Sequence, residues 1–200
     1  MPSSTRQAIL EAAFDLFSRQ GYHGTSMRQI ARQANIALGG IYNHFPNKEA
    51  LFAEVLDAYH PYHDILPALR EDGDSPSADL PAFLHRAAER TRQVLNERPA
   101  FVNLMLIELV EFDASHMPPL YAALQEQTVP LVERFVQAGA ALRDIPIPVM
   151  VRAFIGTLIS YVITERSLDG NLTASFGEDY LENLVDIFLY GILSPSSDTP

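Results

Sequence analysis

Between residues 25 and 48 the sequence holds several side chains that can donate hydrogen bonds to a phosphate or to the edge of a base. The guanidinium of Arg28 can bond guanine O6 and N7 together, or bind a single phosphate. The Tyr42 hydroxyl can donate to a phosphate oxygen, or its ring can be a half-buried aromatic. His44 fits a phosphate contact and a packed histidine equally well. Lys48, the only lysine of the chain, follows a helix cap, where the helix dipole already attracts anions.

These side chains fall on two short predicted helices, over about residues 26–33 and 37–44, joined by a turn at Asn35. A Thr25 or Ser26 hydroxyl can cap the first helix, and asparagine tolerates the left-handed conformation that a tight turn needs. The pattern is typical of a helix-turn-helix whose second helix enters the DNA major groove. The candidate DNA-contacting residues are Thr25, Ser26, Arg28, Leu38, Gly39, Gly40, Tyr42, His44 and Lys48.

The second of these helices has little intrinsic stability. Ala37 stands where a capping hydroxyl is expected, and a missing cap costs about 1 kcal/mol. Gly39 and Gly40 each cost up to about 1 kcal/mol relative to alanine in a helix. Leu38 can offer only an apolar contact, for instance to a thymine methyl group. We therefore expect this helix to order fully only on DNA, with part of the specificity coming from DNA shape.

Charge is distributed unevenly along the chain. The formal net charge is −11, which by itself disfavours binding to phosphates. Residues 1–50, however, carry five basic and three acidic side chains, whereas residues 51–200 carry nine basic and 22 acidic ones. A mildly basic segment on an acidic body suits a protein that touches DNA at one end only.

Five segments in this region together resemble the amino-terminal signature of the tetracycline-repressor (TetR) family of bacterial transcriptional regulators. They are Gly21-Tyr22, Thr25-Ser26, Ile30-Ala31, the run Gly39-Gly40-Ile41-Tyr42-x-His44-Phe45, and Asn47-Lys48-Glu49-x-Leu51. The resemblance covers about residues 5–55, and Ala37 departs from the serine or threonine that commonly precedes the family's recognition helix. It implies an all-α fold of about nine helices. A three-helix DNA-binding domain would occupy residues 1–50, and a helical ligand-binding and dimerisation domain residues 51–200.

Apolar periodicity predicts helices along most of the chain. Their approximate ranges are 5–20, 48–59 after a cap at Asn47 and with a kink or break near Pro61 and Pro67, 80–95, 100–113, 120–142, 148–167 and 176–193. Glycine, proline and acidic residues predict a surface loop over 71–78, and the polar tail 194–200 is expected to be disordered.

The last two predicted helices are apolar nearly all round, so each must be buried on more than one side. Either they form the centre of the monomer core or they also meet a partner subunit. The family resemblance favours the second interpretation, a homodimer formed through the two carboxy-terminal helices.

A small-molecule effector site is predicted in the helical body. Glu108, Glu111 and His116 lie near an apolar helix, where a carboxylate could orient a polar or cationic group of an otherwise apolar ligand, although solvation of a helix end explains them equally well. The candidate pocket residues are Phe101, Met105, Glu108, His116, Tyr121, Phe154 and Tyr161, and the aromatic ones could also be ordinary core. His60 and His63 could bind a metal, but Pro61 disturbs their spacing, and neither a metal site nor a cofactor is predicted.

The sequence contains no nucleophile elbow, phosphate-binding loop, dinucleotide fingerprint or HExxH motif, which disfavours an enzyme. Cysteine is absent, and neither a signal segment nor an apolar run of about 18 residues is found, so we expect a cytoplasmic protein without membrane contact. The favoured hypothesis is a repressor that a small-molecule effector releases from a palindromic operator in double-stranded DNA. The alternative is a helical small-molecule-binding protein without sequence-specific DNA binding. A metal-responsive switch through His60 and His63 is a third.

Overall fold

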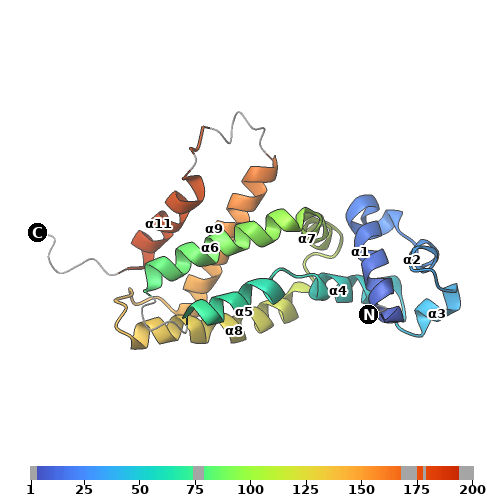
Figure 1. The fold of residues 1–200 in the computed structure, drawn as a ribbon, viewed down its shortest axis with the longest axis horizontal. Coiled ribbons are helices and arrows are strands. Elements are labelled where there is room, and N and C mark those ends of the chain that lie inside the picture. The colour runs from blue at the N-terminus through green and yellow to red at the C-terminus, as the bar shows by residue number, and fades with distance from the viewer. Residues whose placement is uncertain (1–3, 74–78, 168–174, 178, 194–200) are drawn as a thin grey trace, which may run out of the picture. The chain divides into compact units, whose positions relative to one another are not determined.

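The computed structural model describes residues 4–73, 79–167, 175–177 and 179–193. This part of the chain consists of α-helices joined by turns, with one isolated antiparallel bridge between Leu142 and Leu193. The helices are α1 (Thr5–Gly24), α2 (Met27–Gln33), α3 (Leu38–Tyr42), α4 (Lys48–Ala58), α5 (Tyr62–Gly73), α6 (Leu80–Glu97), α7 (Pro99–Glu111), α8 (Met117–Gln137), α9 (Ile147–Ser167) and α11 (Tyr180–Ile192) (Figure 1). The predicted all-α class is confirmed.

The helices form two compact units. The first comprises Met1–His60 and Glu97–Tyr121, and the second Pro61–Asn96 and Ala122–Pro200. The predicted functional division after residue 50 remains a prediction, because compactness does not report which residues bind DNA or ligand.

In the first unit, α1 packs against α2, α4 and α7. Its apolar positions Ile9, Ala13 and Phe17 are completely buried, as their spacing of three and four residues predicts. Phe17 meets Phe52 of α4 edge to face at 5.3 Å. The helix is interrupted at Gly21, whose φ of 74° places it in the region that favours glycine. The predicted end of the first helix at this glycine is thus confirmed.

Local signals set the start of the next helices as the sequence predicts. Ser26 and Gln29 form a capping box at α2, and Asn35 adopts a φ of 55° in the turn between α2 and α3. Asn47 caps α4 by accepting a hydrogen bond from Ala50 N–H at 2.7 Å. Ala37 precedes α3 without a side-chain cap, as the sequence predicts, and the low stability of this helix stays a prediction.

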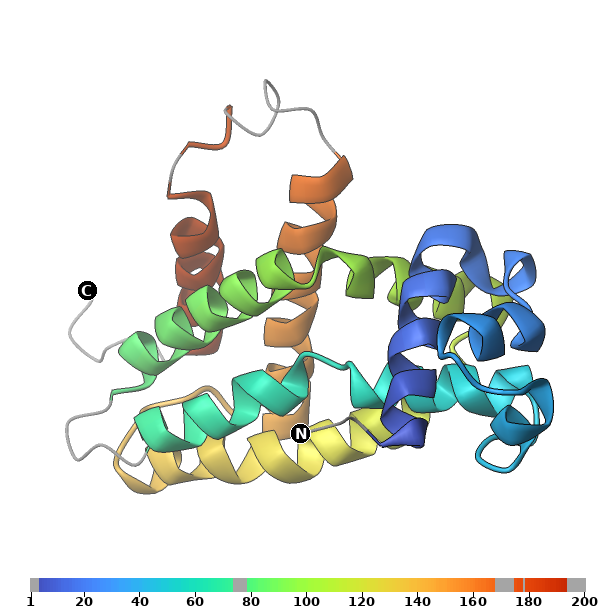
Figure 2. The ribbon, with the colours of Figure 1, turned by 45° about the vertical axis from the view of Figure 1, so that its right-hand side comes forward.

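The second unit contains α5, α6, most of α8, α9 and α11. Its core lies between these helices and includes Phe83, Phe135, Met150, Val185 and Leu189. Helices α5 and α8 run side by side in both ribbon views (Figures 1 and 2), where Arg70 donates to Gln127 Oε1 at 3.1 Å. Helix α9 packs against α11.

Some boundaries differ from the predicted ones. The long helix predicted over 120–142 occupies 117–137, because Gly139 turns left-handed at φ 99° and ends it, with Ala140 N–H bonding back to Phe135 O. The predicted break near Pro61 is present, whereas Pro67 lies inside α5. Residues 71–73 of the predicted loop are helical. The rest of that loop, 74–78, and the tail 194–200 lie outside the described residues.

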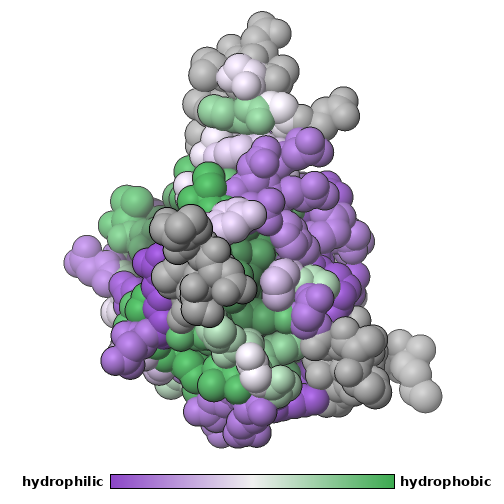
Figure 3. All heavy atoms as spheres, turned by 90° about the vertical axis from the view of Figure 1, so that its left-hand side faces the viewer, coloured by the Kyte–Doolittle hydropathy of each residue, from purple (hydrophilic) through white to green (hydrophobic). Residues whose placement is uncertain are grey.

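Helices α9 and α11 expose large apolar side chains. Val149, Ile159 and Ile163 of α9 are exposed, as are Ile187 and Tyr190 of α11. On the face drawn in Figure 3, hydrophobic surface is gathered beside hydrophilic patches. Ile147–Arg166 is long and apolar enough to cross a membrane by length and composition, a test that helices of non-membrane proteins also pass. This segment departs from the expected absence of such a run.

Candidate nucleic-acid interface

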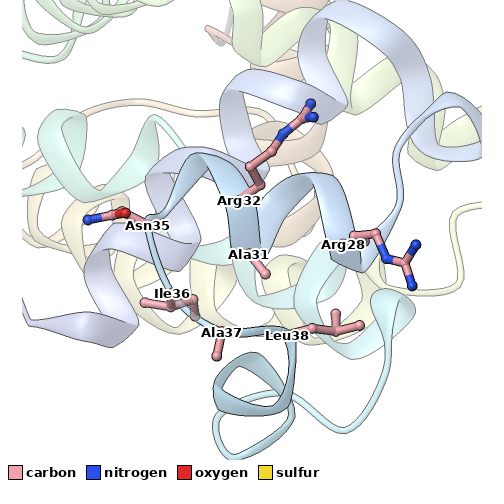
Figure 4. Close-up of a pocket in the computed structure, with 7 residues that line it drawn as sticks. All are labelled: Arg28, Ala31, Arg32, Asn35, Ile36, Ala37 and Leu38. Carbon is pink, nitrogen blue, oxygen red and sulfur yellow. The ribbon is translucent and has the colours of Figure 1, made fainter.

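An open groove of about 510 Å³ lies between α2 and α3 (Figure 4). It is lined by Arg28, Ala31, Arg32, Asn35, Ile36, Ala37 and Leu38. In Figure 4, Arg28 and Leu38 extend toward the same side of the helix pair, whereas Arg32 points away from α3. Arg28 therefore places a cation beside the apolar Leu38 at this groove, which suits a phosphate or base-edge contact, while Arg32 offers a second exposed cation on the side of α2 away from α3.

Helix α2 is held firmly against α1. Met27, Ile30 and Ala31 are buried, and the Gln33 amide donates to Asp15 Oδ2 of α1 at 2.9 Å. With one face fixed in this way, Arg28 and Arg32 both fall on the exposed side. Arg32 is not among the contacts predicted from the sequence, although its i, i+4 spacing from Arg28 indicates that both lie on one face of the helix.

Arg28 and Arg32 differ from the other basic residues of this region in their surroundings. Arg6 pairs with Glu54 and lies over the Phe45 ring, and Arg19 pairs with Asp15 at 2.8 Å. The Lys48 ammonium is held between backbone carbonyls. The cationic charge that is exposed at the α2–α3 groove is therefore that of Arg28 and Arg32.

Helix α3 is anchored by one residue and exposes the rest. Ile41 is completely buried, whereas Leu38 is 37% and Tyr42 50% exposed. A Cβ added at Gly39 would meet nothing within 4 Å, and one at Gly40 would meet only Ile36 Cδ1 at 4.0 Å. Packing inside the chain thus does not require either glycine.

Three of the predicted DNA contacts have structural partners inside the unit. Thr25 is 2% exposed and its hydroxyl donates to the Gly21 carbonyl at 2.9 Å. The Ser26 hydroxyl accepts from Gln29 N–H at the start of α2. Lys48 Nζ donates to the carbonyls of Tyr22 and Thr25. His44, in contrast, is exposed. DNA contacts by all of these residues remain predictions.

The predicted effector residues do not form one described site. Phe101, Met105, Glu108, His116 and Tyr121 belong to the first unit, and Phe154 and Tyr161 to the second. Glu108 is completely buried, and its carboxylate accepts from His116 N–H at 2.7 Å and lies 2.8 Å from His116 Nδ1. The sequence leaves two roles open for this carboxylate, orientation of a ligand and solvation of a helix end, and in the structure it bonds across the turn between α7 and α8.

The glutamate that closes this turn offers a test of the two interpretations. Glu108→Gln is expected to lower the free energy of unfolding by about 1 kcal/mol, because the amide oxygen can still accept from His116 N–H while the charged partner of the ring is lost. Urea denaturation measures the change. Loss of an effector response without any change in stability would instead favour the ligand-orienting role.

No group of three or more His, Cys, Asp or Glu that could hold a metal occurs among the residues described. His60 meets the Phe101 ring edge to face at 5.1 Å, and His63 lies against Tyr62 at 4.1 Å. Each histidine therefore packs against a different aromatic ring, His60 before Pro61 and His63 after it.

Comparison with known proteins places the groove in a recognised domain. The sequence model of "Bacterial regulatory proteins, tetR family" matches residues 9–55. The transcriptional regulator RutR of Escherichia coli K12 is 38% identical over 94 residues, which are 45% of this chain and 42% of RutR. The regulator AcrR of Shigella flexneri is 49% identical over 51 residues, which are 26% of this chain and 24% of AcrR. The chain matches less than half the length of these relatives.

Solved structures resemble the fold over nearly its full length. The fatty acid degradation regulator FadR from Bacillus halodurans has a TM-score of 0.74 at 18% identity, covering 94% of this chain and 96% of that one. FadR from Bacillus subtilis, solved in complex with stearoyl-CoA, has a TM-score of 0.71 at 18% identity. The match covers 93% of this chain and 98% of that one. These likenesses show the fold. The match over residues 9–55, which includes the α2–α3 groove, shows that this segment is similar to the amino-terminal domain of bacterial regulatory proteins of the tetR family.

Proposed function

We propose that the protein is a DNA-binding transcriptional regulator, a repressor that acts as a homodimer on a pseudo-palindromic operator. The observation that carries the proposal is the α2–α3 groove with exposed Arg28 and Arg32, inside a segment that matches the family's DNA-binding domain. The two α3 helices of a dimer would enter successive major grooves about 34–36 Å apart.

The exposed apolar residues of α9 and α11 support the dimer. Ile187 is 70% and Tyr190 77% exposed, and Val149 and Ile159 add further apolar surface. Contiguous apolar surface on a water-soluble protein marks an interface. The carboxy-terminal helix pair of a second copy would cover it, which also accounts for the apolar character of α9 without a membrane.

Ile187→Asp is expected to convert the dimer to a monomer, because a carboxylate buried in an apolar interface loses its hydration without gaining a partner. Analytical ultracentrifugation measures the mass. Val110→Asp is the matched control, since Val110 is 79% exposed on α7 of the first unit. A dimer that survives Ile187→Asp but is lost in Val110→Asp would move the interface to α7.

A small molecule bound in the helical body would favour a state whose two grooves no longer match the operator. By linkage, the affinity lost for DNA equals the affinity lost for the effector when DNA is bound. A bacterial regulator of this kind works in the cytoplasm, where its DNA is. An effector that shifts the melting temperature and leaves operator affinity unchanged would contradict the coupling.

Sequencing of the genomic fragments that the purified protein retains tests the DNA-binding proposal. The expected result is a small set of fragments sharing a pseudo-palindrome, released steeply as salt rises. Retention of no fragment at low ionic strength would overturn it.

A helical small-molecule-binding protein without sequence-specific DNA binding is the second candidate. The uncapped, glycine-containing α3 and the small number of exposed cations at the groove favour it. In that case any DNA binding would be weak and would not depend on sequence.

A further inference from the structure

The Lys48 ammonium is bound by two backbone carbonyls and an aromatic ring of its own chain. Its Nζ donates to Tyr22 O at 2.7 Å and to Thr25 O at 2.8 Å, and lies 4.0 Å from the centroid of the Tyr22 ring. An ammonium has three N–H donors, so two of them go to these carbonyls, and the electron-rich ring face attracts the charge. The group is engaged inside the chain before any DNA arrives.

The two carbonyls belong to the segment that leads from α1 into α2. Tyr22 O also accepts from Thr25 N–H at 3.2 Å, and both carbonyls lie at the negative end of the α1 dipole, so a cation placed there is stabilising. The same segment is closed by the Thr25 hydroxyl, which donates to Gly21 O, and it ends at Ser26, the cap of α2. Because Lys48 is the first residue of α4, its side chain ties the start of α2 to the start of α4.

Other residues of the first unit surround the Lys48 ammonium and the Tyr22 ring. The Tyr22 ring packs edge to face against Phe112 at 4.7 Å and Phe52 at 5.5 Å. Burial lowers the pKa of the Lys48 ammonium, and the nearby Glu111 carboxylate opposes that shift. Glu111 in turn accepts an ion-pair contact from His23 Nε2 at 3.1 Å. The ammonium is thus surrounded by groups from α1, α4 and α7.

We propose that Lys48 is a positioning residue. Its ammonium anchors the α1–α2 segment to α4 and thereby sets the orientation of α2 with Arg28 and Arg32, in place of binding a DNA phosphate. This inference rests on the proposed DNA-binding function. It departs from the expectation for a lysine that follows a helix cap, which is a direct phosphate contact.

Salt dependence separates the two roles. Removal of one phosphate contact reduces the slope of log affinity against log salt by about 0.9. Lys48→Met keeps the unbranched stem and removes the charge. The expected result is an affinity about 10-fold lower at every salt concentration, with the wild-type slope, as for the loss of a part-buried charge-assisted hydrogen bond. A slope reduced by about 0.9 would overturn the proposal. Arg32→Met serves as the comparison that should show the reduced slope.

Hydrogen exchange of the DNA-free protein gives an independent readout. In Lys48→Met the backbone amides of α2 should exchange at least about 10-fold faster, since loss of the anchor lowers the local opening free energy. Unchanged exchange would overturn the proposal whatever the salt slope. The exchange measurement tests the positioning role of Lys48 even if the wild-type protein binds no DNA. Absence of DNA binding would refute the proposed function separately.

Lys48→Arg carries the test if the methionine variant does not fold. Arginine keeps the charge, but its planar guanidinium is larger than the compact ammonium that fits between the two carbonyls. We expect it to retain the wild-type salt slope with reduced affinity and faster exchange in α2. Binding and exchange equal to wild type would instead favour a phosphate contact, which arginine can replace.

Discussion

Replacing Arg28 and Arg32 together by methionine is expected to weaken operator binding by about 100-fold or more near physiological salt. Both side chains are exposed on the groove between α2 and α3. A hydrogen bond to a charged group contributes about 1.5–3 kcal/mol, so two of them account for a loss of this size. Fluorescence anisotropy with a labelled operator fragment measures it, and melting temperature should change little because neither side chain is buried.

The slope of log affinity against log salt divides the loss between phosphate and base contacts. If both arginines bind phosphates, the slope falls by about 1.8, whereas it falls by about 0.9 if Arg28 reads a base. In the second case Arg28→Met alone should also reduce discrimination between the operator and a scrambled sequence.

Arg19→Met is the matched control for the arginine pair. Arg19 is exposed on α1 of the same unit but forms an ion pair with Asp15 at 2.8 Å. Its removal should change operator affinity by less than about twofold, since an exposed ion pair contributes little. Equal losses from Arg19→Met and from the arginine pair would mean that DNA responds to net charge and not to the groove.

The engagement of the other cations supports the proposed selectivity of an acidic chain for DNA. Of the five basic residues in 1–50, Arg6, Arg19 and Lys48 have partners within the first unit. Few charges are then left for non-specific attraction, and the acidic body adds repulsion. Binding away from the operator should therefore be weak, and shape and base contacts should decide where the protein binds.

Much of the first unit follows from signals that act within four residues. The Ser26 cap, the left-handed Asn35 and the Asn47 cap need no tertiary information, so the sequence predicts them correctly, although it leaves Thr25 open as the cap and does not single out Gln29 as the second half of a capping box. The buried faces of α1 and α2 follow from helical spacing in the same way. Gly139 indicates the end of α8, because glycine favours the left-handed conformation that ends a helix. The predicted helix nevertheless runs on to residue 142, because the apolar periodicity continues past this glycine.

The internal pairs of Lys48 and Glu108 could not be predicted in this way. Lys48 meets carbonyls 23 and 26 residues earlier in the chain, and a backbone carbonyl has no sequence signal at all. The pair of Glu108 and His116 spans a turn whose geometry depends on packing against Phe52 and Phe112. In both cases a charged residue near a helix end is indistinguishable by sequence from one that faces solvent or a ligand.

The second large change in operator affinity is expected from a substitution at a glycine of α3. Gly39→Ala is expected to weaken operator binding at least about 10-fold while it stabilises α3 by up to about 1 kcal/mol, because alanine has the higher helix propensity. A Cβ at Gly39 meets nothing in the free chain, so any penalty must come from an external surface. We attribute it to the DNA backbone, which a bare glycine can approach closely.

Gly40→Ala provides the control on the neighbouring residue. Its Cβ would face Ile36 Cδ1 at 4.0 Å, an ordinary contact within the turn, so it should stabilise α3 to the same degree without obstructing DNA. A helix that is better ordered beforehand loses less entropy on binding, and the operator affinity of Gly40→Ala should therefore rise a few fold. If Gly39→Ala also binds more tightly, the close approach at Gly39 is excluded.

The same pair of variants tests whether α3 orders on DNA. In the wild type, amides 38–44 should exchange faster without operator than with it, since Ala37 gives no cap and both glycines favour the unfolded state. Gly40→Ala should slow the exchange of these amides in the free protein. The difference in exchange rate between the free and the operator-bound protein should then be smaller than in the wild type. Equal protection of these amides with and without operator would show that α3 is already formed, and the affinity loss in Gly39→Ala would then be steric alone.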